Sequence, residues 1–498
     1  MTVTQPPASD PKPMEATSGP AAQGSSLMRH SSAYAVGSAV GAALSFFTIP
    51  LLTNLLSTDE FGLLELLNQA ANIAILIVFV GLRQAFFRIF LEEKTPEWKG
   101  RVVGTTLAII LAFGSIAMLV LAAAYPLLER FVFDGKVSVF LYASIVIWMP
   151  LEMLFTIGLS HLQAQGQSIK FVAATIIRGV SYLALIFVFL GLLKLNMAYV
   201  FISHIVICGI GGVLFLTGFV KSHQLQYDKR VFGQIVRYGA PFLPTAFFAY
   251  LLSSSDRWFL VAYQGLEVAG VYSLAFKVGF LGATVLMEPL NRVWSPFAFN
   301  VQASADGPQD IGRMFVIYAI ASLFGGLALA LGADIVIAIV APGSYQEAAN
   351  IVPVLAFAAA IFNIACLSDI GLLIAKKTHI KPLIFSTAAA TCVLSNWILV
   401  PKFGAMGAAF SYLAGVSVLV VVNLSVSNRF YRIRFSYSQA LFAGATVLLP
   451  FAVKVLCQNQ FGMGMVSSLI YAILTALIVA GFWWRVLGVW HTMQRIRF

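Results

Sequence analysis

Long apolar stretches recur along the whole chain, and they limit how it can fold more than any other feature. A helix needs about 20 mainly apolar residues to cross the roughly 30 Å hydrocarbon core of a bilayer. Applied to this chain, that rule predicts about fourteen membrane-spanning helices. They lie at residues 31–55, 62–85, 102–127, 139–162, 171–192, 197–220, 235–263, 268–290, 314–340, 351–375, 382–400, 405–428, 438–456 and 463–484. The expected fold class is an all-α, polytopic membrane protein.

Composition agrees with this prediction and excludes several classes of function. Hydrophobic residues make up 60% of the chain and charged residues 10%, against about 45–50% and about 25% in soluble domains. The connecting segments are too short to hold a catalytic domain. The sequence contains no G-x-x-x-x-G-K-[ST] nucleotide loop, G-x-S-x-G elbow or H-E-x-x-H pair, and its four cysteines are scattered. We therefore expect no enzyme, cofactor or metal site.

The basic residues are distributed as expected for a membrane protein with both termini in the cytoplasm. Most of the 31 lysines and arginines then fall on the inner side, as the positive-inside rule requires. Six fall on the outer side, namely Arg130, Lys136, Lys194, Arg257, Lys402 and Lys454. This pattern accounts for the net charge of +11 better than binding to nucleic acid does. Residues 1–27, rich in Pro, Ala, Ser and Gly, are expected to be a disordered cytoplasmic tail.

Three polar turns indicate an internal duplication with a shift of about 208 residues. DEFG at 59–62 matches EVAG at 267–270, LQAQGQSIK at 162–170 matches LIAKKTHIK at 373–381, and Lys194 matches Lys402. The two copies are separated by an even number of spans, so they share one orientation. We expect two parallel-repeat six-helix lobes at 28–230 and 231–428. Two additional helices and a short tail then follow at 429–498.

Several stretches resemble bacterial polysaccharide flippases of the multidrug/oligosaccharidyl-lipid/polysaccharide exporter superfamily. They are PLLTNLLSTDEFGLLELL (50–67) with GLRQAFFRIF (81–90), RYGAPFLPTAFFAYLLSSSDRWFLVAYQGLEVAGVYSLAFKVG (237–279), GLLIAKKTHIKPL (371–383) and PKFGAMGAAFSYLAG (401–415). The resemblance extends over residues 31–427. It implies two lobes around a central cavity, working by alternating access.

The resemblance also implies a function. An undecaprenyl-pyrophosphate-linked oligosaccharide would cross the inner membrane for the synthesis of lipopolysaccharide or exopolysaccharide at the cell surface. The implied partners are this lipid-linked sugar, the phospholipid bilayer, and a polysaccharide polymerase with its chain-length machinery.

Two basic residues inside spans are the leading candidates for binding the pyrophosphate. Arg178 lies near the middle of the fifth span and Lys277 near the middle of the eighth. A charge at a helix centre costs about 2.5–3.5 kcal/mol on insertion, which marks such residues as functional candidates. The alternative is a buried ion pair that joins helices, with Glu152 and Asp256 as partners.

Other charged residues have weaker claims. Asp256 and Arg257, in SSSDRW toward the outer end of the seventh span, could form a gate, contact the headgroup, or be a surface pair. Arg83 at the inner end of the second span, and Arg292 at the place matching Gln84, could collect pyrophosphate or be ordinary basic flanks. Asp334 and Asp369, within the ninth and tenth spans, could bind a coupling proton or cation.

Three alternative functions stay open on the sequence. A drug/cation antiporter of the same superfamily would need an acidic cavity, which Arg178 and Lys277 oppose. A peptidoglycan-precursor flippase also has fourteen spans. A membrane glycan polymerase or ligase would normally have a large outer loop, and the sequence has none.

Overall fold

The computed structural model describes residues 40–41, 43–79, 81–93, 95–130, 135–434, 437–459 and 465–486. The side chains of 282–293, and some in the last two helices, lie outside this description. Residues 1–27, the predicted tail, also lie outside it. The elements of the described part are all helical, which confirms the predicted fold class.

The helices follow one another with short turns. A first apolar helix, Ala43–Leu55, precedes α2 (Thr58–Val78), α3 (Leu82–Phe90), α4 (Pro96–Leu128), α5 (Val139–Ala164), α6 (Ser168–Ile186) with a π-helical end η2 (Phe187–Leu192), α7 (Ala198–Ser222) and α8 (Lys229–Gly239). The second half contains α9 (Phe242–Gln264), α10 (Leu266–Val301), α11 (Gly307–Val340), η3 (Gly343–Tyr345), α12 (Ala348–Ser368), α13 (Ile370–Ile374), η4 (Thr378–Ile380) and α14 (Lys381–Phe430). The chain continues into α15 (Tyr437–Asn459) and α16 (Met465–Val486).

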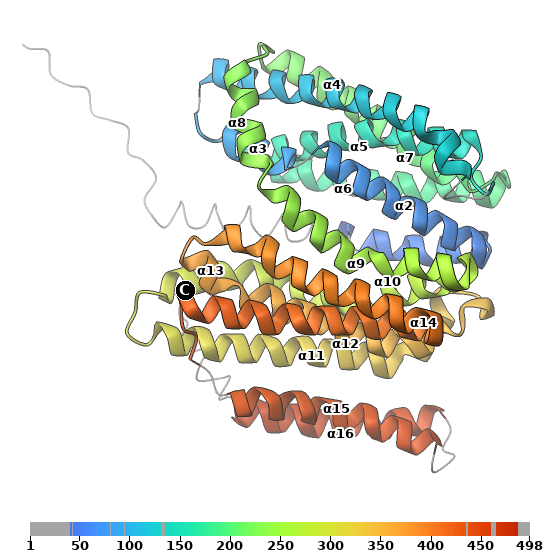
Figure 1. Cartoon of the computed structure of the whole chain (residues 1–498), viewed down its shortest axis with the longest axis vertical. Coiled ribbons are helices and arrows are strands. Elements are labelled where there is room, and N and C mark those ends of the chain that lie inside the picture. Colours follow the sequence, from blue (N-terminus) through green and yellow to red (C-terminus); the bar gives the residue numbers. More distant parts are fainter. Residues whose placement is uncertain are drawn as a thin grey trace, which may run out of the picture.

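These helices form two groups (Figure 1). In the first group, α2–α8, helix α5 packs against α4 and α7, and α8 packs against α3 and α4. In the second group, α9–α14, helix α14 packs along α9, and α12 packs against α10, α11 and α14. Helices α15 and α16 form a hairpin beside α11. The groups meet mainly where α2 packs against α10 and α9. The predicted lobe bounds, 28–230 and 231–428, stay a prediction.

The number of spans is not confirmed. Eight helices of the described residues are long and apolar enough to cross a membrane, and the bent pair α8–α9 adds a ninth. Part of the difference lies in α14, a continuous stretch of 50 residues where two spans were expected. Its backbone turns sharply at Gly404, with φ of 52° and ψ of −131°. Gly407 contacts the backbone of Leu399, and Gly415 contacts Cys392 and Ala388, so the chain reverses at Gly404 and the predicted spans 382–400 and 405–428 pack side by side as a tight helical hairpin.

Two other predicted spans are interrupted. The span at 62–85 ends at Val78, and α3 starts after Gly81, whose φ is 59°. The span at 235–263 is divided between α8 and α9, which are bent by 43° at the break before Phe242. Proline cannot donate the helical hydrogen bond of its own nitrogen, and Pro241 stands at this break.

Helix α2 begins at a complete capping box. The Ser57 hydroxyl accepts a hydrogen bond from the backbone N–H of Glu60 at 3.2 Å, and the Glu60 carboxylate accepts from the backbone N–H of Ser57 at 3.0 Å. Such reciprocal bonds satisfy two of the free donors at a helix start. The cap fixes where α2 starts, and its first half, up to Ala71, carries the buried residues.

Helices α2 and α10 cross with their backbones in direct contact at Gly62 and Gly270. A Cβ added to Gly62 would lie 3.0 Å from the backbone nitrogen of Gly270, and one added to Gly270 would lie 3.1 Å from that of Gly62. Glycine has no Cβ, which allows so close an approach. The two glycines occupy matching positions of the predicted duplication, 208 residues apart. The groups therefore meet at a nearly symmetrical crossing.

Another pair of duplicated turns has the same hydrogen bonds. In the turn at 162–170, the backbone N–H of Gln167 donates to the carbonyl of Leu162, and in the turn at 373–381 that of Lys377 donates to Leu372, both at 2.9 Å. The residue before each donor has a positive φ, 70° and 56°. This is the Schellman ending of an α-helix. The match predicted between these turns extends to their backbone geometry.

Candidate functional site

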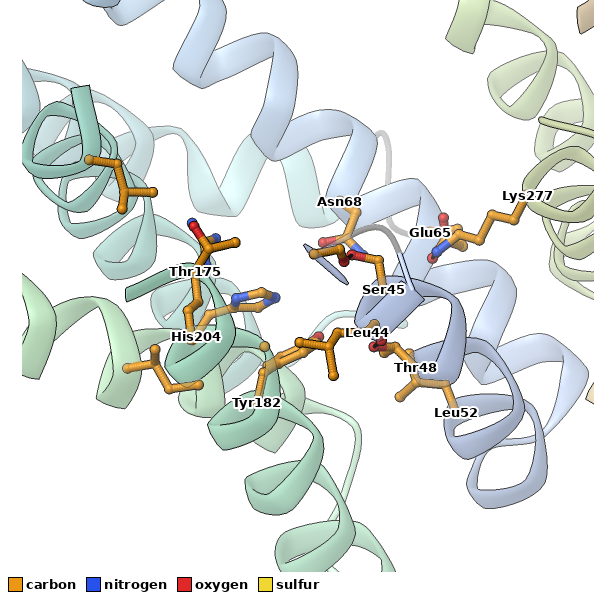
Figure 2. Close-up of a pocket in the computed structure, with 15 residues that line it drawn as sticks. Leu44, Ser45, Thr48, Leu52, Glu65, Asn68, Thr175, Tyr182, His204 and Lys277 are labelled. Carbon is orange, nitrogen blue, oxygen red and sulfur yellow. Dashed lines mark hydrogen bonds and ion pairs between the residues drawn. The ribbon is translucent and has the colours of Figure 1, made fainter. Parts of the chain in front are cut away.

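A cavity of about 440 Å³ opens among the first helix, α2, α6, α7 and α10. Its polar lining contains hydroxyl, amide, imidazole and charged groups, from Ser45, Thr48, Glu65, Asn68, Thr175, Arg178, Tyr182, His204 and Lys277. Figure 2 shows Lys277 reaching from α10 toward Glu65 on α2, with Thr175 and His204 on the opposite side. Both basic residues that the sequence singled out inside spans thus line one cavity.

Arg178 is paired with Glu152, one of its two predicted partners. Its Nη2 donates to both carboxylate oxygens, at 2.8 and 2.7 Å. Glu152 also accepts hydrogen bonds from the Trp148 indole at 3.1 Å and from the Cys208 thiol at 3.3 Å. These residues belong to α5, α6 and α7, so this network lies within the first group of helices. The Arg178 side chain remains 27% exposed, toward the cavity.

Lys277 is paired with Glu65, a partner that the sequence analysis missed. Lys277 Nζ lies 2.7 Å from Glu65 Oε1. The Glu65 side chain is only 5% exposed, whereas that of Lys277 is 35% exposed. Lys277 Nζ also lies 5.7 Å from the centre of the Phe61 ring, within the range of a cation–π contact. This ion pair joins α2 of the first group to α10 of the second.

A signal for Glu65 was present in the sequence. A carboxylate inside the predicted span at 62–85 is a functional candidate, although its place near the end of that span makes its insertion cost lower than that of Arg178 or Lys277. His204 is a second lining residue whose place sequence alone could not give. Its ring stacks between Trp148 and Tyr182, with centroids 4.8 and 4.2 Å away.

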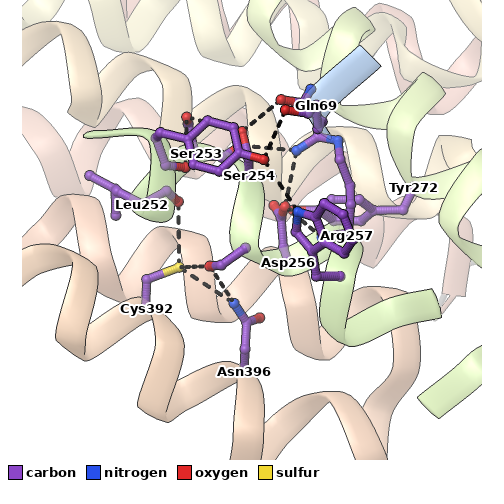
Figure 3. A network of polar contacts seen from close by, with 12 residues as sticks. Gln69, Leu252, Ser253, Ser254, Asp256, Arg257, Tyr272, Cys392 and Asn396 are labelled. Carbon is purple, nitrogen blue, oxygen red and sulfur yellow. Dashed lines mark hydrogen bonds and ion pairs between the residues drawn. The ribbon is translucent and has the colours of Figure 1, made fainter. Parts of the chain in front are cut away.

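Asp256 and Arg257 lie in the packed interior of the second group and do not line this cavity. Arg257 donates from Nη1 to Asp256 at 3.0 Å and to the carbonyl of Ser253 at 2.9 Å. The Tyr272 hydroxyl donates to the other oxygen of Asp256, and the guanidinium lies 4.2 Å over the Phe276 ring. Figure 3 shows this network beside Cys392 and Asn396. Arg257 is therefore buried, where the sequence analysis placed it on the outer side.

Asp334 and Asp369 each have a lysine partner. Asp334 is paired with Lys454 of α15 at 2.7 Å, and Lys454 also donates to the carbonyl of Leu331 at 3.0 Å. Lys454, which the sequence assigned to the outer side, is buried there against α11. Asp369, between α12 and α13, is paired with Lys381 at the start of α14. Both aspartates join helices.

Of the two remaining candidates, Arg83 does not line the cavity. Arg83 is exposed on α3, on the segment that packs against α8. Arg292 belongs to α10, but its side chain lies outside the described residues. Among the residues that the structure describes, His, Cys, Asp and Glu nowhere gather in a group of three or more that could hold a metal ion.

The cavity suits an anionic ligand that also carries hydroxyl groups. Arg178 uses one nitrogen toward Glu152, and a guanidinium has five N–H donors, so several remain for phosphate oxygens. Lys277, on the opposite side of the cavity from Thr175 (Figure 2), contributes a second positive charge as a compact ammonium on a flexible stem. Hydroxyl and amide groups of Ser45, Thr48 and Asn68 can exchange hydrogen bonds with a polar ligand.

Comparison with solved structures gives the fold. The structure is similar to "Lipid II flippase MurJ, inward closed conformation", with a TM-score of 0.65 and 16% identity, over 92% of this chain and 99% of that one. It is also similar to a mutant Vibrio cholerae MATE transporter, with a TM-score of 0.58 and 14% identity, over 83% and 98% of the two chains. A third similar structure is an inward-facing multidrug resistance MATE family transporter of the MOP superfamily, with a TM-score of 0.59 and 12% identity, over 83% of this chain and 95% of that one. These identities establish a shared fold only.

The family follows from the sequence. Comparison with curated protein sequences finds no match. The family described as "Polysaccharide biosynthesis protein" matches residues 27–302, more than half of the chain. The chain is thus a multi-pass membrane protein with the fold of flippases and transporters of the MOP superfamily, and it belongs to the polysaccharide biosynthesis protein family.

Proposed function

We propose that the protein is a flippase that moves undecaprenyl-pyrophosphate-linked oligosaccharides across the bacterial inner membrane for the synthesis of cell-surface polysaccharide. The observation that carries this proposal is the cavity that holds Arg178 and Lys277 between helices of a polysaccharide biosynthesis protein. A pyrophosphate cannot cross hydrocarbon unassisted, because its charge would lose hydration without compensation. Two cations facing a hydrated cavity provide that compensation.

The sugar part of such a substrate needs hydrogen-bonding groups. The cavity offers hydroxyls from Ser45, Thr48, Thr175 and Tyr182 and an amide from Asn68. The Tyr182 ring, one face of which is stacked on His204 at 4.2 Å, adds an aromatic side chain to the same lining. These groups support a ligand that is both charged and rich in hydroxyls.

Movement of the substrate requires the cavity to open alternately to the two leaflets. We propose that the two helix groups, as lobes with bounds near 28–230 and 231–428, rock about the crossing of α2 and α10. The basic residues gather in the segments assigned to the inner side, which supports cytoplasmic termini. A polymerase and chain-length machinery would consume the flipped substrate on the outer side.

A peptidoglycan-precursor flippase is the second candidate. It is favoured by the similarity to the lipid II flippase structure over 92% of this chain. The proposed substrate and lipid II share a pyrophosphate, so the cavity charges suit both. The MATE relatives favour a drug/cation antiporter by fold, but Glu65 and Glu152 are already paired with Lys277 and Arg178, so a cationic drug would have to displace these cations from their carboxylates.

The test is flipping in proteoliposomes. Wild type, Arg178→Ala and Lys277→Ala would each be assayed with three fluorescent substrates. These are undecaprenyl-pyrophosphate linked to an oligosaccharide, undecaprenyl-pyrophosphate linked to the lipid II headgroup, and a cationic dye. Lys402→Ala is the control, because Lys402 is an exposed lysine outside the cavity. We expect oligosaccharide flipping by wild type and the control, and at least a tenfold loss in both cavity variants at equal abundance. Preference for lipid II, or proton-coupled dye uptake without flipping, would replace the proposal by the corresponding alternative.

A further inference from the structure

The ion pair between Glu65 and Lys277 differs from the other cavity pair in what it connects. Glu152 and Arg178 both belong to the first group of helices. Glu65 on α2 and Lys277 on α10 belong to different groups, and their charged atoms are 2.7 Å apart. Opening the groups at this place must separate the Lys277 ammonium from the Glu65 carboxylate.

The two carboxylates also differ in how they are held. Glu152 keeps the Trp148 and Cys208 donors even when Arg178 turns to a ligand. For Glu65, Lys277 is the partner found among the described residues. The carboxylate of Glu65 is buried, while Lys277 is exposed to the cavity and can turn toward its interior. Lys277 is therefore the movable member of the pair.

The pair lies close to the place where the groups touch. Glu65 follows Gly62 by three residues, about one turn of α2, and Gly62 contacts Gly270. Neutral hydrogen bonds accompany it, from the Ser254 hydroxyl to the Gln69 side chain at 2.8 Å and from the Tyr250 hydroxyl to the Gln69 carbonyl at 3.0 Å. Of these cross-group links, the ion pair is the one that an anionic ligand can compete with directly.

We propose that Glu65 is an internal competitor of the anionic substrate for Lys277, and that this competition couples substrate binding to separation of the two helix groups. The inference rests on the proposed function, since it takes the cargo to be anionic. An entering diphosphate binds Lys277 and carries more than one negative charge. It displaces the single carboxylate of Glu65 and removes a link between α2 and α10.

This competition makes Glu65 a residue that determines specificity and release. A neutral or cationic ligand gains nothing by approaching Lys277 and leaves the link in place. After the cavity opens to the other side, Glu65 competes with the diphosphate again and speeds its dissociation. Without the carboxylate, Lys277 should hold the anion more tightly and release it more slowly.

The first measurement is binding of inorganic pyrophosphate to the purified full chain by calorimetry. We expect Glu65→Gln to bind pyrophosphate about five- to tenfold more tightly than wild type, because a competing charge is removed. In flipping assays the same variant should have a lower KM and a lower kcat. Unchanged or weaker pyrophosphate binding by Glu65→Gln would overturn the inference.

The second measurement follows the distance between the two helix groups by double electron–electron resonance spectroscopy. Spin labels would be placed at two exposed residues, 170 in the first turn of α6 and 378 in η4, in a chain without native cysteines. Glu65→Gln without ligand should shift the distance distribution toward that of wild type with pyrophosphate. Glu152→Gln is the matched control: it frees Arg178 for the anion but should leave the distances of wild type.

A double variant that exchanges the two charges of the pair distinguishes loss of the ion pair from simple misfolding. Lys277→Ala should shift the distances even without pyrophosphate, and the double variant Glu65→Lys, Lys277→Glu should restore them by remaking the pair. Failure of the exchange to restore the distances would overturn the coupling. Pyrophosphate binding and spin labels need no lipid-linked sugar, so a chain that does not flip but responds to pyrophosphate refutes the proposed function alone. If the protein flips its substrate normally but Glu65→Gln changes neither pyrophosphate binding nor the distances, this inference alone is refuted.

Discussion

Replacing Asp256 by Asn tests whether the interior of the second group depends on charge compensation. Asp256 accepts from the backbone N–H of Arg257 at 2.8 Å and from its Nη1 at 3.0 Å. It also accepts from the Tyr272 hydroxyl. The two side chains of the pair are 0% and 3% exposed. An asparagine keeps the shape of the side chain but removes the carboxylate paired with the buried Arg257 charge.

The expected cost follows from the burial of both partners. Removing one member of a buried ion pair destabilises a protein by about 3–5 kcal/mol, because an uncompensated charge stays in the interior. The Phe276 ring 4.2 Å below the guanidinium offsets at most about 2 kcal/mol of this. Replacing both residues by apolar ones, Asp256→Leu with Arg257→Met, should return the stability to within about 2 kcal/mol of wild type, since no charge remains to compensate.

The assay is reversible unfolding in mixed micelles, followed by tryptophan fluorescence. Asp59→Asn, at an exposed position in the first turn of α2, is the control and should cost less than about 1 kcal/mol. A loss below about 1 kcal/mol in Asp256→Asn would refute the reasoning, and so would a double variant as unstable as the single one. Flipping by the double variant then separates roles: retained flipping indicates a structural pair, and lost flipping at normal stability supports the predicted gate.

Three further predictions concern other contacts. Gly270→Val should destabilise the protein by about 1–3 kcal/mol or more in the same unfolding assay, because the added atoms meet the α2 backbone; an equal effect of the control Gly218→Val, which has open space, would contradict this. Lys454→Met removes the partner of Asp334 and so weakens the contact of α15 with α11, and proteolysis between α14 and α15 should become several-fold faster. A second change, Asp334→Leu, removes the unpaired charge and should slow proteolysis again. Loss of ion-dependent flipping in Asp334→Asn, with proteolysis as in wild type, would instead favour a role of Asp334 in binding a coupling ion. Burial lowers the pKa of His223, so its contribution to stability is present above about pH 6.5 and is lost as the pH falls through the lowered pKa. Between pH 7.5 and pH 5 the Tm of His223→Gln should therefore drop less than the Tm of wild type. An identical drop in both proteins would contradict this role of His223.

The sequence was sufficient for the fold class and for part of the site. The insertion cost of charges in apolar spans pointed to Arg178 and Lys277, and both line the cavity. The turn match at 59–62 and 267–270 brought Gly62 and Gly270 into correspondence, and these glycines touch. Local patterns and repeats are visible in a sequence because they depend on residues close together or on copies of one another.

Glu152 was among the partners predicted for Arg178, but the partners of Lys277 and Asp334 could not be predicted in this way. Lys277 meets Glu65 across two helix groups, and Asp334 meets Lys454 from the added hairpin. Such pairs depend on how helices pack, which hydropathy does not encode. The turn at Gly404, by contrast, lies between the two apolar stretches predicted at 382–400 and 405–428, because such a turn can be read from the local sequence.

The Gly62–Gly270 contact divides α10 into a long segment and a very short one. From Gly270 to Val301 the helix extends about 46 Å, at about 1.5 Å per residue, whereas only about 6 Å lies on the side of Leu266. A tilt of about 10° at the contact would carry the far end through about 8 Å and the near end through about 1 Å. A change too small to disturb the packing at one end is thus amplified at the other into a displacement wide enough to admit a phosphate group.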